Sequence, residues 1–157
     1  MWLCVGLFAD TTVTHAQGVS RSFHSDYPEE AEDVRNYDPS VAPDAAMWLE
    51  LDESERLNLV REYHRRRRIK VPNLDLHALT HAVIENQLAQ RLAPAASALR
   101  RLLAEGLDRH EAVHALGSVL MEHFWNLTNK PRGDGDPNAP YLAALDKLTA
   151  ASWRASG

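Results

Sequence analysis

The strongest constraint on the fold is the way in which capping residues, prolines and glycines divide residues 38–157 into helical stretches. Asp52 and Asp108 are each followed three residues later by a Glu, which predicts a helix start with a capping box. Gly106 occupies the place of a left-handed residue that ends a helix. The predicted helices cover residues 43–49, 52–67, 74–91, 95–105 and 108–126, and a last one begins at about residue 141. Polar and apolar residues do not alternate over any long run, so we expect an all-α fold, an irregular bundle of about five to six helices.

Residues 38–157 are predicted to form a single helical domain, preceded by an N-terminal extension over residues 1–37. A chain of 157 residues with 45% apolar content is long enough for one compact core. The extension has no sustained period, and its acidic run over residues 28–33 is typical of a solvated tail. Its first nine residues are apolar, as in a signal peptide, but no basic residue precedes them and Asp10 interrupts the run. We therefore expect a disordered or extended tail, or an upstream start of translation, rather than an export signal.

The net charge and the cysteine content argue against several classes of partner and of structure. The net charge of −5 gives no general attraction to nucleic acid, and the run Arg65–Arg68 complements the negative end of the helix predicted to end there. Cys4 is the only cysteine in the sequence, which excludes an intramolecular disulfide and is compatible with the cytoplasm. No stretch reaches the roughly 20 apolar residues of a membrane span. We expect neither nucleic acid nor a membrane as partner, and the identity of any protein partner stays open.

Two pairs of histidines stand four residues apart, His77 with His81 and His110 with His114. Residues with this spacing lie one turn above each other on a helix, so each pair can bind one ion from one face. Apolar residues share both stripes, which predicts that the pairs face the interior, where an unpartnered polar group costs roughly 1 to 3 kcal/mol. The sequence therefore predicts a metal site built from these four histidines, with zinc expected and iron or another transition metal as alternatives. His64 also lies on the apolar side of its predicted helix, but is not part of this ligand set.

Two further residues are singled out by their positions beside the histidine pairs. Glu85 follows His81 by one turn at the outer margin of the stripe, and is a candidate fifth ligand, an acceptor for a ring N–H, or a solvent-facing residue. Gly117 lies one turn beyond His114, where the lack of a side chain permits close approach of a neighbouring helix. We expect that neighbour to bring further ligands.

Residues 110–114 read His-Glu-Ala-Val-His, the HExxH string of zinc proteases, in which the Glu activates a bound water. Glu111 is therefore the candidate catalytic residue, although it also completes the capping box of Asp108. The longer metzincin pattern fails, because its next His would fall on Leu120, and no Glu follows Glu122 to act as a later third ligand. A carboxylate-bridged di-iron or di-manganese site lacks the second Glu-x-x-His and further Glu residues that it requires. A mononuclear site with His ligands is the better prediction.

At these positions the chain resembles a small bacterial family, domain of unknown function number eighteen forty-one, and its close relatives. The resemblance covers roughly residues 40–127. The residues that carry it are Leu76, His77, His81, Glu85, Gln87 and the block 106–114 with the stretch that ends near Trp125. The family has no established biochemical activity, so the resemblance implies a helical domain with the same histidine positions and no particular reaction.

Two functional hypotheses remain open. In the first, the four histidines of the two pairs hold zinc, and Glu111 or Glu85 supports them or acts as general base on a bound water. A closed four-His site would be structural, whereas three ligands and a water would be catalytic. In the second, the protein is a metal-free interaction module whose histidines form a buried hydrogen-bonded network, and the acidic tail or the run Arg65–Arg68 engages a partner. A metal-dependent hydrolase that uses the HExxH string is a third alternative, and the residues indicate no substrate.

Overall fold

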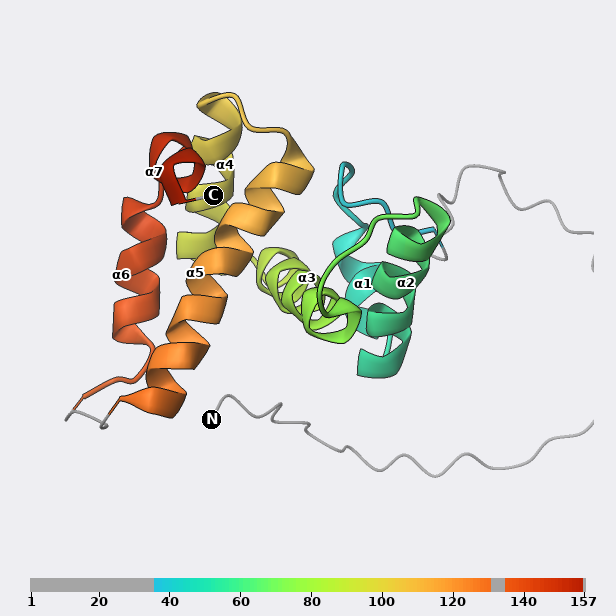
Figure 1. Ribbon diagram of the computed structural model, residues 1–157, viewed down its shortest axis with the longest axis horizontal. Coiled ribbons are helices and arrows are strands. Elements are labelled where there is room, and N and C mark those ends of the chain that lie inside the picture. The colour runs from blue at the N-terminus through green and yellow to red at the C-terminus, as the bar shows by residue number, and fades with distance from the viewer. Residues whose placement is uncertain (1–35, 131–134, 157) are drawn as a thin grey trace, which may run out of the picture. The chain divides into compact units, whose positions relative to one another are not determined.

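The computed structural model describes residues 36–130 and 135–156. Within these ranges the chain forms seven helices and no strand (Figure 1). The helices are α1 (Ala45–Glu50), α2 (Glu53–Arg66), α3 (Leu74–Ala89), α4 (Ala93–Ala104), α5 (Arg109–Asn129), α6 (Ala139–Lys147) and α7 (Ala150–Ser156). The predicted all-α class is confirmed, and α7 is a short helix that the sequence analysis did not include. Among the described helices, none has the length and apolar content needed to cross a membrane.

The helix starts lie at the capping residues that the sequence predicts. Asp52 Oδ1 accepts a hydrogen bond from Glu55 N at 2.8 Å, and Glu55 Oε2 accepts one from Asp52 N at 2.8 Å, so α2 begins at a complete capping box. Asn73 Oδ1 caps α3 in the same manner by accepting from Leu76 N at 3.0 Å. These side chains satisfy backbone N–H groups that the first turn of a helix leaves without partners.

Left-handed residues end α2 and α4. Gly106 follows α4 with a φ of +88°, as the sequence predicts. Arg68 takes a similar conformation after α2, with a φ of 54°, although it is not a glycine. Ile69 N then donates to His64 O at 3.0 Å, which turns the chain back toward α3. This turn brings the end of α2 opposite the start of α3.

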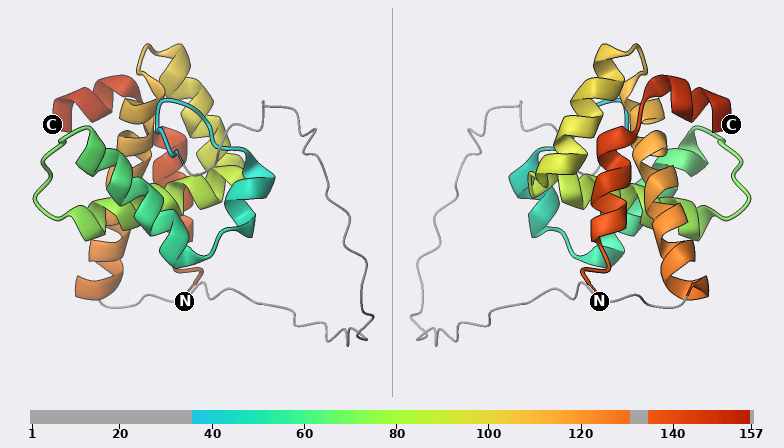
Figure 2. Two further views of the ribbon diagram at one scale, coloured as in Figure 1. Left: turned by 90° about the vertical axis from the view of Figure 1, so that its right-hand side faces the viewer. Right: turned by 90° about the vertical axis from the view of Figure 1, so that its left-hand side faces the viewer.

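Helix α3 is the central element. It packs against α1 and α2 on one side and against α5 on the other, as two directions of view agree (Figures 1 and 2). Helices α4 and α6 also pack against α5, and they enclose an apolar core with it. A second, smaller cluster of buried side chains joins α1 and α2 to α3. The interface of α2, α3 and α5 lies between these apolar regions.

Gly117 sets the spacing of α3 and α5. A Cβ atom at this position would lie 2.6 Å from Thr80 Cγ2, closer than carbon atoms approach without repulsion. The predicted role of Gly117 in close helix approach is therefore confirmed, and the neighbouring helix is α3. The contact lies one turn from His114 on α5 and one residue from His81 on α3.

Tyr37 belongs to the folded domain although it is the last residue of the predicted extension. Its side chain is only 4% exposed and its ring centroid lies 5.6 Å from that of Trp48 and 6.1 Å from that of Tyr63. The remainder of the predicted extension, up to residue 35, lies outside the described residues. The described segment that precedes α1 thus supplies an aromatic residue to the smaller apolar cluster.

Candidate metal centre

Four histidines from three helices each bring one ring nitrogen to within 4.8 Å of the others. We call this set the histidine cluster; its members are His64 on α2, His77 and His81 on α3, and His114 on α5. The Nε2 atoms of His64 and His77 lie 2.9 Å apart, and those of His81 and His114 lie 3.0 Å apart. Neighbouring ring centroids are separated by 4.5 Å for His64 and His77, and by 5.0 Å for His81 and His114. Imidazoles around one zinc ion have ring centres about 5 Å apart, because each Zn–N bond is about 2.0 Å long. The cluster therefore has the dimensions of a metal site.

Three of the four predicted ligands belong to the histidine cluster, namely His77, His81 and His114. His64 stands in the place that the sequence analysis gave to His110. The signal for His64 was its position on the apolar stripe of its helix, 13 residues before His77. A single His on a separate helix forms no i, i+4 pair, so spacing along the chain did not identify it.

His110 lies beside the histidine cluster as a fifth imidazole. Its ring centroid is 4.4 Å from that of His114 and 5.3 Å from that of His81. Its Nε2 atom is buried and has no hydrogen-bond partner among the described residues. Burial lowers the pKa of His110, and the neighbouring imidazole of His64 acts in the same direction. Of the predicted pair, His114 therefore belongs to the histidine cluster, and His110 lies at its edge.

The tautomer of His64 is fixed by the backbone of its own helix. Its Nδ1 atom lies 2.8 Å from Val60 O. A carbonyl oxygen only accepts hydrogen bonds, so Nδ1 of His64 carries the proton and donates it. Its Nε2 atom is left with a lone pair, and Nε2 is the atom that faces His77.

A second contact orients His81 in the same way. Its Nδ1 atom lies 3.1 Å from Tyr37 Oη, and the Tyr37 hydroxyl donates to Glu85 Oε1 at 3.0 Å. Because Tyr37 has one hydroxyl proton and gives it to the carboxylate, its oxygen accepts from the Nδ1–H of His81. The lone pair of His81 is then on Nε2, the atom that meets His114. Metal-bound histidines commonly have such a partner on the other ring nitrogen.

Glu85 supports this arrangement rather than joining the histidine cluster. Its side chain is 1% exposed and forms a bidentate ion pair with Arg109, with Nη1 to Oε1 at 2.9 Å and Nη2 to Oε2 at 2.6 Å. Three roles were predicted for Glu85: a fifth ligand, an acceptor for a ring N–H, or a solvent-facing residue. The carboxylate is buried and is not a member of the cluster, and it reaches His81 only through the hydroxyl of Tyr37 rather than by accepting from a ring N–H. Burial opposes the charge of Arg109, but the hydrogen bonds and charge of Glu85 outweigh it and raise the pKa of Arg109. Sequence reasoning did not identify Tyr37 or Arg109 as part of the site.

Three imidazoles of the cluster, those of His77, His81 and His114, are neutral at pH 7 for a physical reason. Burial lowers the pKa of His77 and of His114 to about 4, and the neighbouring imidazoles lower both pKa values further. Burial and the neighbouring imidazoles also lower the pKa of His81 well below its usual range. Neutral imidazole is the form that coordinates a metal ion, so the surroundings favour that form before any ion binds.

Glu111, the predicted catalytic residue, is engaged at the start of α5. Its Oε2 atom accepts from Asp108 N at 3.1 Å, and Asp108 Oδ1 accepts from Glu111 N at 2.8 Å. The side chain is exposed and belongs to the capping box. It is not a member of the histidine cluster.

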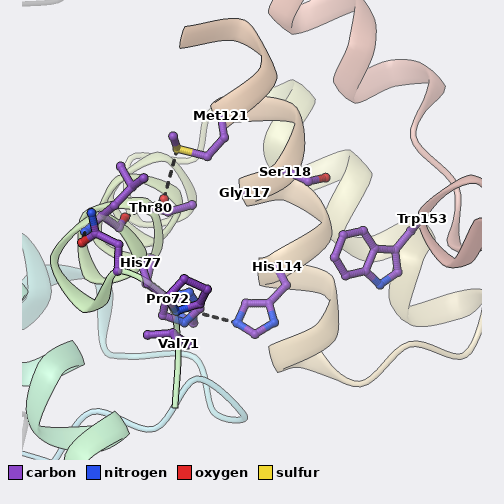
Figure 3. Close-up of a pocket in the computed structure, with 12 residues that line it drawn as sticks. Val71, Pro72, His77, Thr80, His114, Gly117, Ser118, Met121 and Trp153 are labelled. Carbon is purple, nitrogen blue, oxygen red and sulfur yellow. Dashed lines mark hydrogen bonds between the residues drawn. The ribbon is translucent and has the colours of Figure 1, made fainter. Parts of the chain in front are cut away.

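One open pocket with a volume of about 420 Å³ reaches the histidine cluster (Figure 3). Three members of the cluster, His77, His81 and His114, line it, and His64 does not. Figure 3 shows His77 and His114 approaching the pocket from different helices. The cluster is therefore accessible from one side.

Comparison of the chain with family models, with curated proteins and with solved structures found no match in any of the three. Function is accordingly inferred from the geometry and chemistry of the site.

Proposed function

We propose that the protein binds one transition-metal ion, with zinc as the expected metal, through the Nε2 atoms of the histidine cluster. The observation that carries this proposal is the convergence of four ring nitrogens from three helices within 4.8 Å. The partners of the Nδ1 atoms support it, because Val60 O and Tyr37 Oη leave the lone pairs of His64 and His81 on Nε2.

The ligand chemistry narrows the choice of metal. Calcium and magnesium prefer oxygen ligands, and the cluster supplies only imidazole nitrogens. Imidazole suits zinc, copper, iron and nickel. Zinc accepts four such ligands in a tetrahedral arrangement at about 2.0 to 2.1 Å, which agrees with the number and spacing of the rings.

A metal-free hydrogen-bonded network is the second candidate, and the short Nε2–Nε2 distances favour it as well. His77 Nε2–H would donate to His64, and His114 Nε2–H would donate to His81. Such a network satisfies the rings in two separate pairs. One metal ion satisfies all four nitrogens at a single centre, which also explains why the two pairs lie against each other.

Elemental analysis of protein purified without an affinity tag tests the proposal. We expect one ion per chain in the wild type after zinc is supplied, and less than a tenth of that in His114→Gln. The matched control is His123→Gln, because His123 is also a buried histidine of α5 but stacks on Tyr141 outside the cluster. A wild type that remains metal-free with zinc, iron, nickel or copper, or a His114→Gln variant that retains its ion, would overturn the proposal in favour of the hydrogen-bonded network.

The resemblance to domain of unknown function number eighteen forty-one stays a prediction. Its two blocks fall on α3 and on the start of α5, the two helices that supply His77, His81 and His114. If the resemblance reflects common descent, proteins of that family will bind metal through the same positions. Elemental analysis of one such protein checks this.

A further inference from the structure

The pocket beside the histidine cluster has walls that offer few free polar groups. Thr80 Oγ1 donates to Leu76 O at 2.8 Å, and Ser118 Oγ donates to Ala115 O at 2.8 Å. Asn73 Oδ1 is used by the cap of α3. The remaining wall is largely apolar and is formed by Val71, Pro72, Leu76, Gly117, Met121 and Trp153, in which the indole N–H of Trp153 is the one side-chain donor. The imidazoles at one end are thus the principal polar feature that a bound molecule would meet (Figure 3).

The charge around this end of the pocket favours an anion. Metal-binding imidazoles are neutral, so the histidine cluster leaves the charge of a divalent ion without compensation. None of the 12 residues that line the pocket is Asp, Glu, Lys or Arg. The buried carboxylate of Glu85 is already paired with Arg109. The charges of Asp108 and Glu111 reach His114, but both carboxylates are exposed to solvent and are engaged in the capping box of α5. In surroundings of low polarity, such an uncompensated ion attracts a negatively charged ligand strongly.

The burial of the rings shows from which side an ion would be reached. His64 and His81 are each 1% exposed, whereas His77 and His114 are partly exposed and line the pocket. A zinc site can expand from four to five ligands when a further donor is bound. A further donor can therefore approach an ion in the cluster from the pocket, where His77 and His114 are partly exposed.

These observations go one step further than the proposed metal centre and rest on it. We infer that the pocket is a binding site for a small organic monoanion, such as a monocarboxylate, whose head coordinates the metal ion and whose apolar body lies against Val71, Leu76, Met121 and Trp153. The volume of about 420 Å³ falls within the range of small-molecule sites. A cation of the same shape is disfavoured by the charge of the metal ion.

Titration of the cobalt-substituted protein with carboxylates of increasing length tests this inference. Cobalt(II) reports a fifth donor through the intensity and position of its visible absorption bands. We expect acetate, butyrate and hexanoate to change the spectrum with rising affinity, by about fourfold for each methylene group that becomes buried. Hexylammonium, which has the same apolar body and the opposite charge, is expected to leave the spectrum unchanged. Equal affinity for acetate and hexanoate, or equal binding of hexylammonium, overturns the inference.

A pair of leucine variants locates the site. Leu76 lines the pocket and is 43% exposed, while Leu103 on α4 is 42% exposed and does not line it. Leu76→Ser is expected to weaken hexanoate binding about tenfold without changing the cobalt content, and Leu103→Ser is expected to change neither. Equal hexanoate affinity in both variants would contradict the inference.

The result also separates this inference from the proposal on which it rests. If cobalt and zinc do not bind at all, the proposed metal centre is wrong. If cobalt binds with one ion per chain and no carboxylate alters its spectrum, the metal centre stands and the anion site alone is wrong.

Discussion

The two faces of α5 bury different kinds of side chain and are therefore stabilised in different ways. Toward α4 and α6 the helix presents apolar side chains, among them Leu116 and Leu120, which belong to the larger core cluster. Toward α3 it presents His114, Gly117 and Met121, which line the pocket. The first face is stabilised by removal of apolar surface from water and requires no ligand. The second buries nitrogen atoms that must be hydrogen-bonded or coordinated.

The comparison shows how a small helical domain can combine a cluster of buried histidines with a stable apolar core. The apolar face of α5 supplies packing that does not depend on the site. The histidine face is held at close range by Gly117 and oriented by the Tyr37–Glu85–Arg109 group. We therefore expect changes on the two faces to respond differently to metal, and the following predictions test that difference.

The largest expected loss of stability follows from a substitution on the apolar face of α5. Leu116 is fully buried, so Leu116→Ala should lower the free energy of unfolding by about 2 to 5 kcal/mol. The loss should be the same with zinc and with a chelator, because the side chain lies away from the pocket. Urea denaturation under both conditions measures it, with the exposed Leu103→Ala as control. A loss that depends strongly on zinc would show that the two faces are coupled.

Metal binding should stabilise the histidine face. Free zinc at about 100 times its dissociation constant is expected to raise the free energy of unfolding by about 2.7 kcal/mol. The increase should disappear in His114→Gln and persist in His123→Gln. Thermal unfolding with zinc and with a chelator gives the measurement, and an equal increase in all three proteins would place the zinc outside the histidine cluster.

The close packing of α3 against α5 can be disturbed by the addition of a single carbon atom at Gly117. Gly117→Ala places a Cβ at 2.6 Å from Thr80 Cγ2, and such overpacking should cost about 1 to 3 kcal/mol. The double variant Gly117→Ala with Thr80→Ser removes the opposing methyl group and should recover most of this loss. Urea denaturation of the single and double variants checks the prediction. If the double variant is no more stable than Gly117→Ala, the contact with Thr80 is not the cause.

Loss of the hydrogen bond that orients the His81 ring is expected to have a smaller effect, on zinc affinity. Tyr37→Phe removes the hydroxyl that contacts both His81 Nδ1 and Glu85 Oε1, and should weaken zinc binding about tenfold. Competition with a coloured chelator measures the affinity. Tyr63→Phe is the control, because Tyr63 is a buried tyrosine that packs against Tyr37. Unchanged affinity in Tyr37→Phe would argue against a supporting role for the hydroxyl.

The metal-free protein should lose stability gradually in acid. The pKa of His77 and of His114 is about 4 in the folded state, below the ordinary value of 6.5, so the unfolded chain takes up protons first. Their contribution is fully present above pH 6.5 and is lost as the pH falls toward 4. Solvent exposure of both rings keeps the effect modest.

Unfolding temperatures between pH 7 and 4 in a chelator measure this contribution. Carboxylates also titrate in the lower part of the range, so the wild type is compared with the double variant His77→Gln, His114→Gln. The wild-type curve should be steeper between pH 6.5 and 4. Parallel curves would show that folding does not lower the pKa values of these two imidazoles.

Local patterns predicted the parts of the site that lie within one helix. The capping residues Asp52, Asn73 and Asp108 marked the starts of α2, α3 and α5, because a cap depends on residues three positions apart. The i, i+4 spacing of His77 and His81 likewise follows from the helical repeat. These relationships are written in short stretches of sequence and do not depend on how helices pack.

Contacts between distant segments could not be predicted in this way. His64 is a single histidine on its helix, and Tyr37 lies before the first helix, 44 residues from His81. The assignment of His110 to the centre of the site rested on its pairing with His114, but the helix direction places His110 at the edge of the cluster. Such distances depend on the crossing of α2, α3 and α5.

The sequence by itself determined the helices and the sides on which their histidines and apolar residues lie, because hydrophobic periodicity and end capping act over a few residues. Only the tertiary structure decided which four imidazoles meet, which ring nitrogen faces the centre, and that Glu85 pairs with Arg109 rather than joining the cluster. The physical reason is that these choices depend on close packing between helices, where one missing Cβ at Gly117 sets how near the two histidine-bearing helices α3 and α5 can come.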